Sequence, residues 1–373
     1  MTGARFDRTP AEQGLLAQGQ AIAEAHPRPA GRPLDGAELR AIFRALAPTG
    51  YLASTLPREA GGQGLSAAEF CALCEGLAPG LTLIGNHSVQ RYLQQFGDAA
   101  QRARFLPALL EGDGVGAIAM TEPQVGSDLE RMTTTARRSG HGYVIDGEKT
   151  WVTHGLSATL IVLLAKTDHG LTRFLVPGDA PGVRRIAMEP VGLRHLGFAR
   201  LAFDGCEVPA EWRLGGEGEG LRGAKAAFPI ARVIAATQAV RIARAAVAIA
   251  RDYAEGRSVA RAPLAGSSLV QHGIAHLSAR CEAVSLLCRR VADDLQAEDV
   301  VATASAAKAL AGELALDACR WTEDLLGSTS LEAAHPLATL AGDARMMAVV
   351  DGTSVLNHLV VARRLLPVRG GAA

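Results

Sequence analysis

Residues 119–128, with the sequence AMTEPQVGSD, mark the point at which the character of the chain changes. On their N-terminal side, apolar residues recur every three to four positions, as in Leu39, Ile42, Phe43 and Leu46, and this spacing predicts helices. On their C-terminal side, as far as about residue 222, short β-compatible runs are bounded by Gly, Pro or Asp, which indicates strands. The stretch therefore separates a helical segment from a β-rich segment.

The strongest turn signal in the β-rich segment is Asp146-Gly147, which stands between the runs YVI (143–145) and KTWV (149–152). Asp-Gly supplies the positive φ angles of a tight turn, so we expect a β-hairpin here. Further strands are expected at 160–164, 173–176 and 201–203, spaced as in a small antiparallel barrel or sandwich. Strands do not alternate with helices, which argues against a parallel dinucleotide-binding sheet.

From about residue 224 the chain becomes rich in Ala and Leu and has few helix breakers. We expect four helices, at about 225–255, 268–296, 300–326 and 336–366, the last interrupted at residues 351–353. The predicted fold is α+β. It comprises an N-terminal helical domain (1–117), a middle antiparallel β-barrel or sandwich domain (118–223) and a C-terminal four-helix bundle (224–373).

Composition excludes several classes of protein. The 373 residues include 38 Lys+Arg and 38 Asp+Glu, so the net charge is zero, and a nucleic-acid binder would carry a basic surplus. Hydrophobic residues make up 48% of the chain, enough to bury a large core, which argues against disorder. The apolar run 160–165 is far shorter than the ~20 residues of a membrane-spanning helix. Residues 1–13 do not resemble a signal peptide. We therefore expect a cytoplasmic protein that does not cross a membrane.

No metal site is expected from the cysteines or histidines. Cys71 and Cys74 have no second pair at zinc-ligand spacing, and the six cysteines are scattered, which suits reduced thiols. His272 and His276 are one helical turn apart, but position 273 is Gly, where a zinc protease motif has Glu. The glycines of 216–220 lack the third glycine of a dinucleotide-binding loop.

Residues 119–128 resemble the acyl-CoA dehydrogenase family. The resemblance continues in the family's order through 147–153 (GEKTWVT), 203–209, 215–220 (GGEGEG) and 351–354 (DGTS). Upstream, 57–65 (PREAGGQGL) and Phe96-Gly97 resemble landmarks of the family's N-terminal domain. Ordered matches over roughly 300 residues are far more specific than any one motif.

The resemblance implies the three-domain fold already expected and an FAD cofactor between the middle domain and the bundle. In the family, the adenine end of FAD reaches a neighbouring subunit, so a homodimer or homotetramer is expected. The implied activity is α,β-dehydrogenation of an acyl thioester, either acyl-CoA or an acyl group on a carrier protein. The implied electron acceptor is a partner such as an electron-transfer flavoprotein.

The same resemblance assigns roles to individual residues. Ile118, Met120 and Trp151 are expected to form an apolar wall for the flavin ring, and Thr121 and Thr153 to be its hydroxyl partners.

Two neighbouring residues are expected to bring backbone amides close to the flavin pyrophosphate or the thioester carrier, namely Gly126 and Ser127. Further cofactor contacts are implied for Arg257, Gly327 and Thr353. Substrate contacts are implied for Ser127, Arg232 and Gly352.

The expected catalytic base is Asp351, where family members usually have Glu before Gly-Thr-Ser. Asp is one methylene shorter, so its oxygen reaches ~1.5 Å less far unless the backbone or substrate shifts. Some branches carry the base on the first bundle helix, but the corresponding position is Ala231. Asp351 has an alternative interpretation as an ordinary cap ahead of the last helix. Of the two, we favour the base.

Three further departures concern the grip on the cofactor. The family's Arg-x-Phe-Gly reads Arg257 to Arg261 (RSVAR), its Gly-Gly pair reads Gly327-Ser328, and the Gln after Gly-Thr-Ser is Val355. Two rival functions follow. One is a flavin oxidase of the nitroalkane-oxidase type, which also uses an aspartate base and pairs it with an arginine where this chain has His358. The other is a flavin-poor scaffold.

Overall fold

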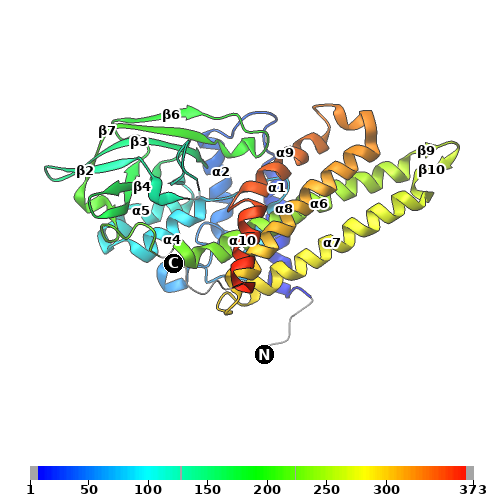
Figure 1. The fold of residues 1–373 in the computed structure, drawn as a ribbon, viewed down its shortest axis with the longest axis horizontal. Helices are drawn as coiled ribbons and strands as arrows, with labels where there is room; N and C mark the ends of the chain where they lie inside the picture. Colours follow the sequence, from blue (N-terminus) through cyan, green and yellow to red (C-terminus); the bar gives the residue numbers. More distant parts are fainter. Residues whose placement is uncertain (1–6, 127, 223, 367–373) are drawn as a thin grey trace.

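The structure is a computed structural model that describes residues 7–126, 128–222 and 224–366. It is elongated, with a β-sheet at one end and long helices extending to the other (Figure 1). The sheet opens with β1 (Gly116–Ala119) and the bundle opens with α6 (Ala224–Gly256).

Most of the N-terminal helices begin at well-formed caps. They are α1 (Pro10–Ala25), α2 (Gly36–Leu46), α3 (Ala67–Leu77), α4 (Asn86–Phe96) and α5 (Ala99–Glu111). A capping box, in which the N-cap side chain and the third helical residue exchange hydrogen bonds, starts α1, α2, α3 and α5. The predicted stripe of α2, Leu39, Ile42, Phe43 and Leu46, is buried.

The middle domain is one sheet that contains both parallel and antiparallel pairs. Its further strands are β2 (Thr135–Ser139), β3 (Gly142–Val152), β4 (Leu160–Thr167), β5 (Gly170–Pro177), β6 (Val183–Ala187), β7 (Ala199–Pro209) and β8 (Arg213–Leu214). Their order is β6-β7-β3-β2-β4-β5-β8, and β1 pairs with β4 off this path. The expectation of purely antiparallel pairing needs correction, because β1 and β2 both run parallel to β4.

The predicted hairpin at Asp146-Gly147 is wrong. β3 runs without a turn from Gly142 to Val152, and its pairing with β7 shifts register between Ile145 and Gly147. A Cβ on Gly147 would lie 2.6 Å from Thr134 Oγ1, and the φ of Gly147 is +145°. The glycine therefore serves a close approach of backbones and a bulge within one strand, which the same dipeptide signals as readily as a turn.

The bundle agrees with the predicted helices. After α6 come α7 (Ser268–Asp293), α8 (Val300–Leu326), α9 (Pro336–Val349) and α10 (Ser354–Leu365), with a small hairpin of β9 (Ser258–Val259) and β10 (Ala262–Pro263) at the far end. The predicted interruption at 351–353 is the turn between α9 and α10. Residues 228–256 are long and apolar enough to match a membrane span by composition, but 72% of the tested window is buried inside the protein.

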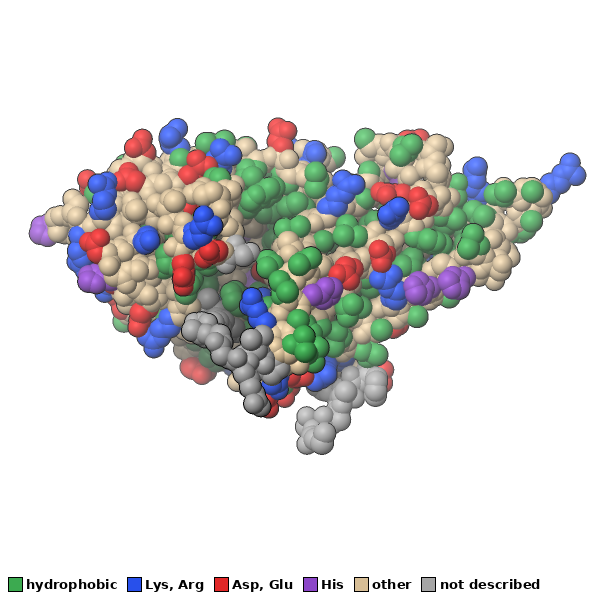
Figure 2. All heavy atoms as spheres, in the orientation of Figure 1, with side chains coloured by type: hydrophobic (Ala, Val, Ile, Leu, Met, Phe, Trp, Pro, Cys, Tyr) green, Lys and Arg blue, Asp and Glu red, His purple; other side chains and the backbone are tan. Residues whose placement is uncertain are grey.

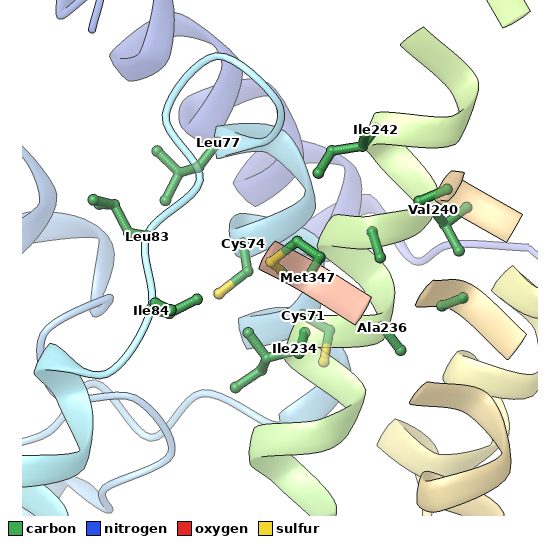
Figure 3. Close-up of a cluster of buried hydrophobic side chains, with 14 of the residues drawn as sticks. Cys71, Cys74, Leu77, Leu83, Ile84, Ile234, Ala236, Val240, Ile242 and Met347 are labelled. Carbon is green, nitrogen blue, oxygen red and sulfur yellow. The ribbon is translucent and has the colours of Figure 1, made fainter. Parts of the chain in front are cut away.

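The bundle and the N-terminal helices share one core. Figure 3 shows Cys71 and Cys74 of α3 beside Ile234 of α6 and Met347 of α9. All six cysteines are free thiols and all are buried, as expected of a reduced protein. α6 is therefore a core helix that contacts α3, α8 and α9 at once.

One buried carboxylate joins all three domains. Asp343 of α9 forms an ion pair with Arg28, from the segment between α1 and α2, and its Oδ1 accepts a hydrogen bond of 2.6 Å from the backbone N–H of Leu193. A Cβ on Gly192 would lie 2.1 Å from the carbonyl carbon of Gly342, so the backbones of the middle domain and α9 touch here. This junction lies eight residues before Asp351.

Candidate active site

The loop that follows β1 is anchored by a fully buried ion pair. Glu122 Oε1 lies 3.0 Å from Lys149 Nζ, and both side chains are 0% exposed. Lys149 also donates to the carbonyl oxygen of Met120 at 3.0 Å. Glu122 also accepts hydrogen bonds from the backbone N–H groups of Thr133 and Thr134, at 2.7 and 2.8 Å, from the Thr133 hydroxyl at 2.8 Å and from the Gln124 amide at 3.1 Å. This buried ion pair therefore links the motif 119–128 to the motif 147–153.

These contacts decide the charge state of Glu122. Burial alone would raise its pKa, but the hydrogen bonds from Thr134 and Thr133 and the contact with Lys149 outweigh that effect and lower the pKa to about 2. Glu122 is thus a carboxylate at neutral pH, and it holds the loop as a charged anchor.

The expected flavin wall lies at the edge of the sheet. Ile118 and Met120 line a small cavity together with Tyr92, Val162, Leu164, Arg173 and Gly220. Trp151 has a left-handed φ of +56° at the end of β3, and its side chain is 47% exposed, which is unusual for so large an apolar group. Its ring makes an edge contact with Phe198, with 5.9 Å between centroids.

The two expected hydroxyl partners are available to a ligand. Thr121 and Thr153 are half-buried, and within the described residues neither hydroxyl makes a hydrogen bond. The carbonyl of Thr121 is occupied by the N–H of Thr150 at 2.9 Å. A Cβ on Gly126 would meet nothing within 4 Å, so the protein itself does not fill the space beside this glycine. Ser127 lies outside the described residues. An exposed aromatic ring and free hydroxyls fit the edge of a bound flavin.

The turn between α9 and α10 presents Asp351. Its φ is +55°, a left-handed conformation that Asp adopts more readily than most residues. The interpretation of Asp351 as a helix cap is wrong, because the Thr353 hydroxyl caps α10 by accepting from the N–H of Leu356 at 3.3 Å. Among the described residues, the Asp351 carboxylate has no hydrogen bond and no ion pair within 4.0 Å.

Two cations lie near this carboxylate without pairing with it. The side chain of Asp351 is accessible to water, yet protein surrounds it on most sides, and this environment raises its pKa above the ordinary value. The positive charges of Lys308 and Arg232 act in the opposite direction. Figure 2 shows the surface hollowed where the β-domain meets the bundle helices.

The backbone of the turn is held by two buried side chains. Lys308 of α8 donates to the carbonyl oxygens of Ala348, at 2.9 Å, and Gly352, at 2.8 Å. The Asn357 amide donates to the carbonyls of Gly352 and Thr353, at 2.9 and 3.1 Å. Since the N–H of Gly352 also reaches Val349 O, both backbone polar groups of Gly352 are already engaged.

Arg232 is anchored on the same side of the bundle. Its Nη1 donates to Ser305 Oγ at 2.9 Å, and its guanidinium lies 5.2 Å from the centre of the Phe228 ring. Burial lowers its pKa, and the negative charge of Asp351 raises it. Most of its five donors therefore remain free for a ligand within the described part of the chain.

Two expected cofactor residues lie far from this region. Arg257 and Gly327 lie at the end of the bundle that carries β9 and β10, opposite the sheet (Figure 1). Arg257 is exposed, and its guanidinium lies 5.5 Å from the Tyr253 ring. Gly327 ends α8 with a φ of +58° and open space around it. Within one chain, these residues do not meet those near Trp151.

The residue expected to support an oxidase points elsewhere. His358 Nε2 lies 3.8 Å from Glu313 Oε1 on the outer side of α8 and α10, where both side chains are about half exposed. His358 therefore lies next to Glu313 and does not pair with Asp351. The two histidines of α7, His272 and His276, stack with centroids 5.9 Å apart, and no cluster of three or more metal-binding side chains is found among the described residues.

Sequence reasoning missed four residues that hold the site. Glu122 and Lys149 lie within the two motifs, but the sequence pattern assigns them no role. Lys308 of α8 and Asn357 of α10 lie outside every motif. A usable signal existed for Lys308, because it is the sole charged residue in the small-residue run 301–312 of a predicted core helix.

The comparisons with known proteins agree with this geometry. Family profiles described as the N-terminal, middle and C-terminal domains of acyl-CoA dehydrogenase match residues 9–113, 117–206 and 218–366. Benzylmalonyl-CoA dehydrogenase of Aromatoleum aromaticum is 34% identical, covering 96% of this chain and 99% of that protein. Human mitochondrial short-chain specific acyl-CoA dehydrogenase is 32% identical, covering 85% of this chain and 80% of that protein.

Solved structures give the same answer. Butyryl-CoA dehydrogenase from Megasphaera elsdenii superposes with a TM-score of 0.89 at 26% identity, covering 97% of this chain and 99% of that one. The three matched domains define an FAD-dependent oxidoreductase. The chain belongs to the acyl-CoA dehydrogenase family.

Proposed function

We propose that this protein catalyses the α,β-dehydrogenation of an acyl-CoA thioester, with Asp351 as the base that removes the α-proton. One observation carries the proposal. Asp351 is an accessible carboxylate that makes no hydrogen bond or ion pair in the described residues. It is not the N-cap of α10, because Thr353 fills that position. A general base needs an acceptor oxygen that the protein has not already occupied.

The chain's own residues supply the proton chemistry. An Asp351 oxygen would take the α-proton while the β-hydrogen leaves as hydride, for which bound FAD would be the acceptor. The raised pKa makes Asp351 a stronger base than an ordinary aspartate, while the positive charges of Lys308 and Arg232 favour its carboxylate form. Arg232 is proposed to contact the substrate, because most of its N–H donors are free.

The remaining contacts are proposed from residues that a ligand could reach. Ile118, Met120 and Trp151 would hold the flavin ring, and Thr121 and Thr153 would hydrogen-bond to its edge. Gly126 and Ser127 would adjoin the pyrophosphate or the thioester carrier, and Thr353 the cofactor near the base.

The proposed partners follow from the same family. Arg257 and Gly327 would contact the FAD of a neighbouring subunit in a homodimer or homotetramer, since within one chain they lie at the end of the bundle opposite the sheet. The name of one similar solved structure refers to an electron-transferring flavoprotein, and we propose that class as electron acceptor. We propose CoA as the carrier, because the relatives' names specify CoA thioesters, with an acyl-carrier protein as the rival.

The test is anaerobic bleaching of the bound flavin by a panel of acyl thioesters. Each acyl group is presented on CoA and on acyl-carrier protein, and we expect the CoA form to react faster. Asp351→Asn should lower the bleaching rate by at least ~10³-fold, because an amide cannot accept the proton, while flavin content and thioester affinity remain near wild type.

The outcomes separate the rival functions. Bleaching by Asp351→Asn at the wild-type rate would remove Asp351 from the mechanism. Hydrogen peroxide formed in step with substrate under air would indicate an oxidase instead. A purified protein that retains no flavin, even when FAD is added in excess, would indicate a scaffold.

A further inference from the structure

A buried lysine lies directly behind the turn that carries Asp351. Lys308 is 1% exposed, and its ammonium group donates to Ala348 O and Gly352 O, one on each side of Asp351 in the sequence. α8 and α9 approach closely here, since a Cβ on Gly312 would lie 3.0 Å from the Cα of Ala348. Lys308 lies one helical turn before Gly312 on α8, and it therefore packs against the end of α9.

Two neighbouring residues of α8 serve the same region. Ser305 holds Arg232 at 2.9 Å, and Lys308, three residues later, holds the turn. Residues three apart lie on one face of a helix, so α8 presents both supports together. Within the described residues, Arg232, Lys308 and Asp351 are the charged groups that act on one another at this place, two positive and one negative.

A purely structural role explains this lysine poorly. Burial lowers the pKa of Lys308 to about 8, with Asp351 raising it and Arg232 lowering it further, so the protein bears a cost for keeping a cation here. The neutral amide of Asn357 already donates to the same Gly352 carbonyl. A neutral donor would thus suffice to hold the turn, and the charge needs a separate reason.

We propose that Lys308 is a positioning residue for the reaction: its ammonium group fixes the turn in the conformation that presents Asp351, and its charge favours the carboxylate form of Asp351. The inference rests on the proposed role of Asp351 as the base. The ammonium has no contact with Asp351 itself, so it acts through the backbone and through space.

The test compares Lys308→Met, Lys308→Gln and Lys308→Arg with Asn357→Ala, using the pH dependence of flavin bleaching by one reactive thioester. In wild type the rate rises with pH as Asp351 ionises. Removing a nearby positive charge should move the midpoint of that rise upward by about one unit in Lys308→Met and Lys308→Gln. The rate at neutral pH should fall about tenfold or more, while half-saturation by the thioester changes less than about twofold.

Asn357→Ala is the matched control, because it removes a neutral donor from the same carbonyl. We expect it to lower the rate without moving the midpoint. Lys308→Arg keeps the charge and should keep the wild-type midpoint, even if the displaced turn reduces the rate.

An unchanged midpoint in the neutral Lys308 variants would overturn the inference. If neither neutral variant folds with flavin, Lys308→Arg decides, because a midpoint shifted upward despite the retained charge would also overturn it. Asp351→Asn tests the proposed function separately. If that variant is inactive while the Lys308 variants behave as wild type, only the role of Lys308 is lost.

Discussion

Glu122 and Lys149 form an ion pair of 3.0 Å whose two side chains are completely removed from solvent. Each comes from a different motif of the sequence, one in the loop after β1 and one in β3. Glu122 also accepts hydrogen bonds from Thr133 and Thr134, so the loop after β1 is held by a charged network. Such a network tolerates the loss of one partner poorly.

We therefore predict that Lys149→Met destabilises the protein by about 3–5 kcal/mol, because it leaves Glu122 buried without its counter-ion. The double variant Glu122→Leu with Lys149→Met should lose less than the sum of the single losses. Urea unfolding of the four proteins measures these free energies. Additive losses would contradict the coupling. The exposed pair Arg137–Asp146 is the control, and Arg137→Ala should cost under about 1 kcal/mol.

Stability should fall as the pH falls from about 6.5 towards 4. Burial lowers the pKa of His87 and of His154 to about 3, and that of His195 to about 4. The unfolded chain binds protons at these residues near pH 6.5, and the folded chain does not, so their contribution is complete above 6.5 and is lost on acidification. At pH 5 each accounts for about 2 kcal/mol.

Urea unfolding at pH 5, 6 and 7 measures this loss. The variant His87→Phe, which suits the aromatic contacts of His87 with Tyr51 and Phe70, should reduce the pH dependence by about one third. A pH dependence unaltered by this substitution would show that His87 already protonates in the folded protein.

Gly147→Ala should destabilise the middle domain. Its φ of +145° is open almost only to glycine, and the new Cβ would lie 2.6 Å from Thr134 Oγ1 and 2.7 Å from Thr134 Cα. A loss of at least about 2 kcal/mol is expected. Gly14→Ala in α1 is the control, because its Cβ meets nothing within 4 Å, and it should stabilise the helix by roughly 0.5–1 kcal/mol. Thermal unfolding of both variants decides; a neutral Gly147→Ala would refute the close approach.

Arg257→Ala should weaken FAD retention about tenfold, as expected for loss of one charged hydrogen bond. Because Arg257 lies far from the Trp151 region of its own chain, the affected flavin should belong to the neighbouring subunit. Hybrid oligomers of Arg257→Ala and Asp351→Asn chains test this directly. Sites that combine an intact Asp351 with the neighbour's intact Arg257 should regain activity at low FAD. No recovery would mean that Arg257 serves its own chain or no flavin.

Helix positions and domain order could be predicted from the sequence, because they depend on local periodicity and on helix-ending residues. The break at 351–353 was visible for that reason. The continuous strand at Asp146-Gly147 was not predictable, since the close approach of Thr134 that requires Gly147 arises from the pairing of β2 with β3. The local sequence shows that a glycine is present, but it does not show which neighbouring residue leaves no room for a side chain.

The supports of the site were hidden for a similar reason. Lys149 lies between Glu148 and Thr150 in the sequence, where it resembles an ordinary surface charge, and only the pairing of β3 buries it. Likewise, Lys308 lies in a helix rich in small residues, and only the packing of α8 against α9 and α10 determines which groups it contacts. The charge state and partners of such groups depend on tertiary contacts that no local pattern encodes.

Asp343 ties α9 to Arg28 and Leu193, and thereby to both other domains, eight residues ahead of the acidic turn. A fragment comprising the bundle alone would expose this carboxylate to water without Arg28 and Leu193, and α9 would lose the contacts that orient it against the other two domains. The placement of Asp351 in space consequently depends on how all three domains dock, and not on the bundle helices alone.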